Sequence, residues 1–277
     1  MSYIHALYDF KFLENISTIC IRGFPINQNA IGKTPLKIPT NDEKIYATKE
    51  EVLHFMLSSL IGEIFTWSSI QNGNIINEII PIKEDENKPI SSGANYPLDF
   101  HTEDAFHPFA GEYLSLLCMR NPTQTPISLV YTSDLSLTEE IKSVLFQNRF
   151  KIGINYAHQL PQIDFLSPIL FGRFEDPYIR LNMNNIGVSD GDLEAEMALK
   201  SLYQEMKFKQ TKFILRSGDF IFIDNFKTIH AREEFHAKYD GADRWLKRLY
   251  ITNDLRRSRY LRTNAHSRII NILEKPD

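Results

Sequence analysis

Short runs of strand-forming residues, separated by turn signals, dominate the chain after the Asn72-Gly73 dipeptide. Such runs predict β-strands, and only two stretches among them show the helical spacing of apolar residues. The pattern favours a mainly β fold, a double-sheet barrel of the jelly-roll type, over alternating strand–helix–strand units. The predicted strands cover residues 75–82, 98–103, 113–119, 127–132, 150–156, 178–183, 213–215, 219–223 and 246–252.

Helices are predicted in three places. Residues 49–65 follow Thr48, a residue type that caps helix N-termini, and their apolar side chains recur at helical spacing. The other two predicted helices, 137–147 and 192–206, belong to an insertion between about residues 133 and 210. Long insertions in compact β folds are usually functional, so we expect this one to form a lid or a wall of the substrate site.

The composition excludes several classes of protein. With 43% hydrophobic and 24% charged residues, the chain is globular, and no linker divides residues 1–277, which predicts a single domain. The net charge of −4 gives no overall attraction to nucleic acid or membranes, and the basic run over 256–268 is interpreted as a solvated face. We expect a cytoplasmic protein, because a secretory pattern and a membrane span are lacking and cysteines are few.

Ionisable residues gather beside the predicted strands. His101 and Glu103 point to one face of a strand, so an imidazole and a carboxylate can converge there. An apolar strand and a turn deliver His230, and two imidazoles with one carboxylate form the facial set that binds iron. Arg244 and Arg248 share a strand face about 13 Å apart, a spacing at which each guanidinium can bind a different carboxylate.

The order of these residues resembles that of the iron(II)/2-oxoglutarate-dependent oxygenases. It reads His-x-Glu, then Gly-Asp-x-x-x-x-Asp-Asn-x-x-x-x-His-x-Arg, then an Arg 14 positions after that His. The segments HTEDAFHP, SLLCMRNP and RWLKRLYITNDLRRSR are similar to the clavaminate synthase-like branch, which includes hydroxylases of free arginine, lysine and asparagine. The resemblance implies a double-stranded β-helix (jelly-roll, cupin-like) core with a helical lid insertion.

Carried over by position, the resemblance implies a metal and cosubstrate site. His101, Glu103 and His230 would bind Fe(II). Arg244 would hold the distal carboxylate of 2-oxoglutarate. The hydroxyl of Ser128, at a position where the family usually has threonine, would help to bind the same carboxylate.

The resemblance also implies substrate-binding residues. Arg248 would bind the α-carboxylate of an amino acid, and Gln71 with the free oxygen of Glu103 would hold its α-amino group. Asn182 and Asn184 fall in the lid, where arginine-hydroxylating relatives carry aspartates that pair with guanidinium. Because burial of an unpaired cation is costly, this departure leaves lysine, asparagine, glutamine or a derivative open beside arginine.

Other polar residues near the motifs are interpreted as structural. Asp104 is expected not to bind the metal but to lie beside its ligands or at the surface, and His158 has no partner pattern. Arg232 is expected to brace a loop through a salt bridge.

The implied enzyme uses Fe(II), O2 and 2-oxoglutarate to hydroxylate an unactivated C–H bond, at the β or γ carbon, of a free L-amino acid, and releases succinate and CO2. Glu103 occupies the position that halogenases of the superfamily leave without a carboxylate, which favours hydroxylation; desaturation stays open. Two alternatives remain. One is a two-His-one-Glu zinc hydrolase, although the sequence has no His-Glu-x-x-His motif. The other is a non-catalytic jelly-roll protein that binds a small ligand.

Overall fold

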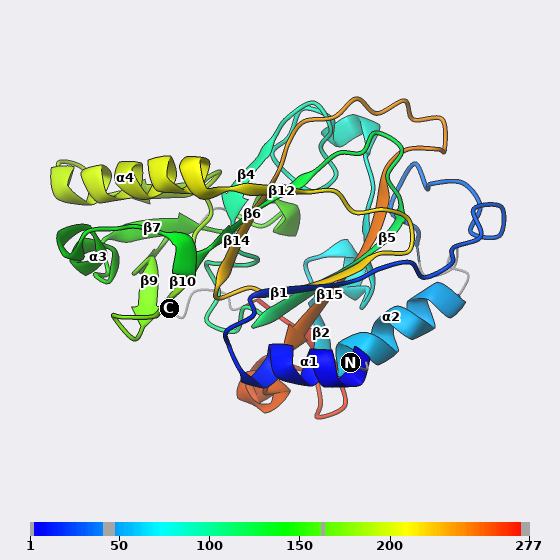
Figure 1. The fold of residues 1–277 in the computed structure, drawn as a ribbon, viewed down its shortest axis with the longest axis horizontal. Coiled ribbons are helices and arrows are strands. Elements are labelled where there is room, and N and C mark those ends of the chain that lie inside the picture. The colour runs from blue at the N-terminus through cyan, green and yellow to red at the C-terminus, as the bar shows by residue number, and fades with distance from the viewer. Residues whose placement is uncertain (1–2, 41–47, 162–163, 273–277) are drawn as a thin grey trace.

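Two facing β-sheets form the centre of the fold (Figure 1). The computed structural model describes residues 3–40, 48–161 and 164–272. The strands of the larger sheet, in pairing order, are β1 (Thr18–Ile21), β13 (Phe220–Asp224), β5 (Tyr113–Arg120), β15 (Trp245–Thr252), β2 (Glu63–Trp67) and β16 (Ile269–Ile270), with β3 (Asn77–Ile79) also paired to β15.

The smaller sheet lies opposite and supplies most of the candidate site. Its strands, in pairing order, are β12 (Thr211–Phe213), β6 (Ile127–Tyr131), β14 (Thr228–Arg232) and β4 (Leu98–His101). Side chains alternate between the two faces of a strand, so β6 sends Ile127 and Leu129 inward. There they share one core with Leu116 of β5 and Leu246 of β15. The predicted jelly-roll core is confirmed.

Two helices cover the outer face of the larger sheet. α1 (Tyr3–Phe12) buries Leu7 in a core shared with β13 and β15. α2 (Lys49–Ser59) begins as predicted after Thr48, whose hydroxyl accepts a hydrogen bond from the Glu51 N–H, while the Glu51 carboxylate accepts one from the Thr48 N–H. This capping box satisfies two backbone donors that the first turn leaves without partners.

The helix predicted over 49–65 is confirmed up to Ser59 and is wrong beyond it. α2 ends at Ser59, and the chain continues as β2. At the junction, Gly62 lies so close to β15 that a Cβ there would stand 2.5 Å from the Thr252 carbonyl oxygen. A strand buried on both faces is a continuous apolar run, which residue spacing alone does not distinguish from a helix.

The insertion at 133–210 packs against the outer face of the smaller sheet. Its core includes Val130 and Ile229, the side chains that β6 and β14 send away from the larger sheet. Figure 1 shows its helices at the end of the molecule away from α2. Its elements are α3 (Glu139–Leu145), β7 (Phe150–Gly153), β8 (Asp164–Ser167), β9 (Leu170–Gly172), β10 (Pro177–Ile179), β11 (Ile186–Val188) and α4 (Leu193–Lys209).

The remaining helical elements are single turns or short 3-10 segments. They are η1 (Gln71–Gly73), η2 (Lys83–Asp85), η3 (Thr132–Asp134), η4 (Tyr156–His158) and η5 (Leu255–Leu261). Of the helices in the described part of the chain, none has both the length and the apolar character needed to cross a bilayer.

Candidate metal and cosubstrate site

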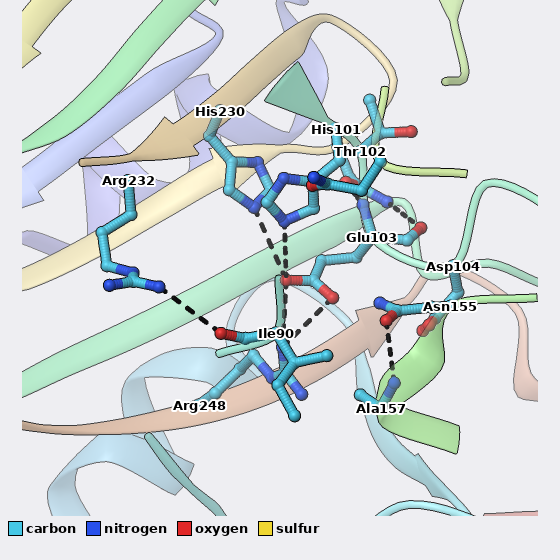
Figure 2. Close-up of polar contacts among 12 residues, drawn as sticks. Ile90, His101, Thr102, Glu103, Asp104, Asn155, Ala157, His230, Arg232 and Arg248 are labelled. Carbon is cyan, nitrogen blue, oxygen red and sulfur yellow. Dashed lines mark hydrogen bonds and ion pairs between the residues drawn. The ribbon is translucent and has the colours of Figure 1, made fainter. Parts of the chain in front are cut away.

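Strand pairing in the smaller sheet brings two histidines together. β14 and β4 run antiparallel with His230 opposite His101, and the two ring centroids are 4.2 Å apart. Glu103 lies two residues beyond His101, and its Oε1 is 3.9 Å from Nε2 of His101 and 3.5 Å from Nε2 of His230. One ligand atom from each residue lies within 4.8 Å of the others (Figure 2). The structure therefore brings the three predicted metal ligands to one point.

The surroundings of His101 determine which of its ring nitrogens is free. Nδ1 lies 2.8 Å from the Asp99 carbonyl oxygen. A carbonyl oxygen can only accept, so Nδ1 carries the proton and Nε2 keeps its lone pair. Burial lowers the pKa of His101 to about 3, and the nearby His230 makes a smaller contribution in the same direction. The imidazole is therefore neutral at physiological pH, the form that binds a metal.

Asn225 positions Glu103, although it was not among the predicted site residues. Its side-chain oxygen accepts a hydrogen bond from the Glu103 N–H at 2.8 Å, and its amide donates to the carbonyl oxygens of Glu103 and Gly111 at 3.1 and 2.9 Å. Asn225 lies in the turn between β13 and β14, where the Asp224 carboxylate accepts hydrogen bonds from the N–H groups of the two residues after Asn225. The Asp-Asn pair before the distal histidine is the sequence signal for this role.

Glu103 forms a buried ion pair with Arg248. Nη1 of Arg248 lies 3.0 and 3.1 Å from the two carboxylate oxygens. Burial alone would raise the pKa of the Glu103 carboxyl, but Arg248 and the two histidines outweigh it and hold the pKa well below its ordinary range. Glu103 is therefore ionised. One ionised carboxylate and two imidazole nitrogens are the donor set that fits ferrous iron in a facial triad.

The three ligands face a cavity that is lined by arginines. Arg232, Arg244 and Arg248 all line it. Arg244 is 4% exposed, and its Nε has no hydrogen-bond partner among the described residues. Burial lowers the pKa of Arg244 to about 10. A buried cation that has no carboxylate partner in the described part of the chain calls for an anionic ligand, so the residues of this cavity fit a carboxylate of 2-oxoglutarate.

A second cavity adjoins the first at Ser91 and Arg248, which line both. Gln71 lines it too, but its side chain is engaged: Nε2 donates to the Glu78 carbonyl oxygen at 2.8 Å, and Oε1 accepts from the Glu78 N–H at 2.9 Å. The φ angle of Gln71 is 45°, in the left-handed region that residues other than glycine rarely adopt. Backbone strain of this kind gathers at functional sites.

Asp104 joins three parts of the chain beside the second cavity. Its Oδ1 lies 2.9 Å from Nε2 of His158, and its Oδ2 accepts a hydrogen bond from Trp67 Nε1 at 2.5 Å. Nδ1 of His158 lies 2.7 Å from Ser69 Oγ. Asp104 is 1% exposed. The contact with His158 therefore connects η4, which belongs to the insertion, to Asp104, which directly follows Glu103.

Three of the predicted site residues lie outside the cavities. Ser128 alternates with Leu129 along β6, so it points to the outer face of the sheet, away from the cosubstrate cavity. Asn182 Oδ1 accepts a hydrogen bond from the Asn184 N–H at 3.2 Å, and Asn184 Oδ1 accepts one from the Asp99 N–H at 3.0 Å. Both asparagines shape the chain beside β4, and neither is among the described residues that line the two cavities.

The fold and the site together define a class of protein, the non-heme iron(II) oxygenases that use 2-oxoglutarate. The family model described as taurine catabolism dioxygenase TauD, TfdA family matches residues 165–250. The enduracididine beta-hydroxylase of Streptomyces hygroscopicus is 29% identical over 96% of this chain and 85% of its own. The L-ornithine/L-arginine 3-hydroxylase of Catenulispora acidiphila is 30% identical over 95% of this chain and 84% of its own.

Solved structures show the same likeness. The non-heme iron oxygenase OrfP, in complex with iron, succinate and (3S)-hydroxy-L-Arg, matches with a TM-score of 0.90 at 34% identity over 96% of this chain and 85% of that chain. Its complex with iron and alpha-ketoglutaric acid matches with a TM-score of 0.89. The chain belongs to the iron(II)/2-oxoglutarate-dependent oxygenases, in the clavaminate synthase-like branch that includes amino acid hydroxylases. The predicted family, its fold and its use of Fe(II), 2-oxoglutarate and O2 are confirmed.

Proposed function

We propose that the protein hydroxylates an unactivated C–H bond, at the β or γ carbon, of a free L-amino acid: lysine, arginine, asparagine, glutamine or a derivative of one of them. O2 and 2-oxoglutarate are consumed, and succinate and CO2 are released. The observation that carries the proposal is the convergence of His101, Glu103 and His230 with Arg244 and Arg248 on one cavity. The relatives that hydroxylate amino acids support the same class of substrate.

The side chains suit these roles. His101, Glu103 and His230 hold the ferrous ion, which supplies the oxidation by O2 that no side chain performs. Arg244 binds the distal carboxylate of 2-oxoglutarate, because its planar fork matches a carboxylate and its Nε has no partner in the described part of the chain. All four residues are buried, so the protein excludes bulk water from the reacting atoms.

Arg248 binds the α-carboxylate of the amino acid at the junction of the two cavities. Its Nη1 is committed to Glu103, whereas its Nη2 only reaches Asn77 Oδ1 at 3.4 Å, and its Nε has no partner among the described residues. The guanidinium can therefore hold Glu103 on one edge and receive a carboxylate on the other. The α-amino group lies between Glu103 and Gln71 Oε1, because an amide oxygen can accept a second hydrogen bond beside that from Glu78.

The side chain of the substrate lies in the second cavity. This cavity has a volume of about 490 Å³. Its wall carries Ser69, Gln71, Glu78, Asp85 and His158. Such a polar wall favours an amino acid whose side chain ends in a group that forms hydrogen bonds or carries charge.

Aerobic incubation of the Fe(II)-loaded protein with 2-oxoglutarate and each free amino acid in turn tests the proposal. We expect at least one of the named amino acids to gain one oxygen atom by mass spectrometry, together with stoichiometric succinate. The same reaction with zinc in place of iron is the control. Hydrolytic activity with zinc alone would support a hydrolase instead, and binding of an amino acid without succinate release would support a binding protein.

A further inference from the structure

Arg232 connects the cosubstrate cavity to a loop that covers the substrate cavity. It follows His230 by two residues on β14, so the two side chains share a face, and it lines the first cavity with Arg244. The predicted salt bridge is absent among the described residues. Instead Nη2 donates to the Ile90 carbonyl oxygen at 3.4 Å (Figure 2). It also donates to the Tyr96 carbonyl oxygen at 3.2 Å, and Nη1 donates to the Glu233 carbonyl oxygen at 3.3 Å.

Two buried cations therefore face one cavity. Arg232 and Arg244 are 5% and 4% exposed, and their guanidinium carbons lie 5.0 and 5.9 Å from the centroid of the Phe235 ring. An anion in the cavity reduces the repulsion between the two guanidinium groups.

Arg232 is one of several residues that hold the loop of residues 90–96, whose backbone also forms hydrogen bonds with Ile82 and Glu86. Ser91 lines both cavities, and Ile90 and Ser92 line the second one. One further contact holds the loop on the same side, because the Phe235 N–H donates to the Ala94 carbonyl oxygen at 2.9 Å. The guanidinium of Arg232 thus stands between the anion-binding cavity and the backbone that forms a wall of the substrate cavity.

We propose that Arg232 is a positioning residue that couples the two ligands. A carboxylate of the cosubstrate in the first cavity fixes the Arg232 guanidinium, which holds the 90–96 loop against the second cavity and so strengthens binding of the amino acid. The inference rests on the proposed function for the identity of the two ligands. Coupling of this kind is reciprocal, so the amino acid strengthens binding of 2-oxoglutarate by the same factor.

Binding to the Fe(II)-loaded protein under anaerobic conditions, where no turnover occurs, measures this coupling. In the wild type we expect 2-oxoglutarate to increase the affinity for the amino acid about tenfold and to slow hydrogen exchange of the backbone amides at 90–96. In Arg232→Gln we expect an affinity ratio close to one and no response of these amides, while 2-oxoglutarate still binds through Arg244. Arg232→Lys keeps the positive charge but lacks the planar guanidinium, and we expect an affinity ratio between those of the wild type and Arg232→Gln.

Arg262 provides a matched control. It is also a buried arginine that donates to backbone carbonyl oxygens, those of Ala265 and Ser267 at 3.0 and 2.7 Å, and it is not among the described residues that line either cavity. We expect Arg262→Gln to keep the wild-type ratio.

The outcomes separate this inference from the proposed function. An unchanged ratio in Arg232→Gln would overturn the inference, and so would complete loss of 2-oxoglutarate binding, because Arg232 would then be a direct ligand. Unchanged exchange at 90–96 when 2-oxoglutarate binds the wild type would overturn the inference alone. A wild-type protein that bound no 2-oxoglutarate would overturn the proposed function as well.

Discussion

Asp104 and His158 form a buried contact, with Oδ1 and Nε2 2.9 Å apart, between the residue that follows Glu103 and the η4 turn of the insertion. His158 also lines the second cavity. One polar contact therefore relates the position of a metal ligand to the wall of the substrate cavity, although the two segments are distant in the sequence.

Replacement of Asp104 by Asn keeps the shape of the side chain but removes its charge and one of its two acceptor oxygens, so the amide cannot accept hydrogen bonds from both Trp67 and His158. We expect the free energy of unfolding to fall by about 2 kcal/mol, and the KM for the amino acid to rise more than the KM for 2-oxoglutarate. Denaturant unfolding and steady-state kinetics measure the two effects. Asp134→Asn, at an exposed position, is the control and should change neither. Equal stability of the two variants would contradict the prediction.

Asn225→Ala should weaken iron binding while the protein stays folded. The substitution removes the hydrogen bonds that hold the backbone of Glu103, and loss of such supporting contacts typically lowers metal affinity by roughly 10- to 100-fold. Anaerobic Fe(II) titration measures the affinity. The control is Asn121→Ala, because the Asn121 amide likewise donates to two backbone carbonyl oxygens but lies outside the metal site. An equal loss of affinity in both variants would count against a specific role for Asn225.

Arg248, on β15, and Arg244, just before it, should affect the kinetic constants of different reactants. We expect Arg244→Ala to raise the KM for 2-oxoglutarate and Arg248→Ala to raise the KM for the amino acid, each by about a hundredfold, or ~3 kcal/mol, because each variant leaves a buried carboxylate without its cation. Steady-state assays with one reactant varied at a time measure both constants. The opposite pattern would show that the two roles are exchanged.

His54 makes stability depend on pH. It is buried on α2 with Nε2 2.7 Å from Ser115 Oγ. Burial lowers its pKa from 6.5 to about 3, and the charge of Lys247 makes a smaller contribution in the same direction. The unfolded chain therefore binds this proton at a higher pH than the folded protein does. The stability associated with His54 is complete above pH 6.5 and is lost as the pH falls toward 3.

We therefore expect His54→Gln to show a flatter dependence of unfolding free energy on pH between about 6.5 and 3 than the wild type. Denaturant unfolding of EDTA-treated protein at a series of pH values measures it, and metal removal keeps the iron ligands from contributing through metal release. If the unfolding free energies of the two proteins changed in parallel with pH, the prediction that His54 has a lowered pKa in the folded protein would be contradicted.

Long strands with mostly apolar residues could be predicted from the sequence. The runs over 113–119 and 246–252 correspond to β5 and β15 within one residue at each end. β14 was not predicted as a strand, because its inward positions carry His230 and Arg232, and these polar residues interrupt the alternation on which such a prediction depends. The functional side chains of β14 therefore make this strand difficult to predict from the sequence.

The candidate site was predictable where a motif is short and local, as for His101 and Glu103, although the strand predicted over 98–103 ends at His101 and Glu103 lies in the turn beyond it. Contacts between distant segments were not. Arg232 donates to a carbonyl oxygen 142 residues away, and no local pattern indicates that partner. The orientation of Ser128 depends on its register along β6, where a shift of one residue exchanges the two faces of the sheet.

The alignment of β14 with β4 has a consequence for how the protein matures. Because His230 and His101 stand opposite each other on neighbouring strands, pairing of β14 with β4 one position out of register would place an imidazole on the other face of the sheet. Such a misassembled molecule would lack a complete set of donors and could not retain iron. The metal site is therefore complete only when β4 and β14 pair in this register, so iron binding and strand pairing are thermodynamically linked.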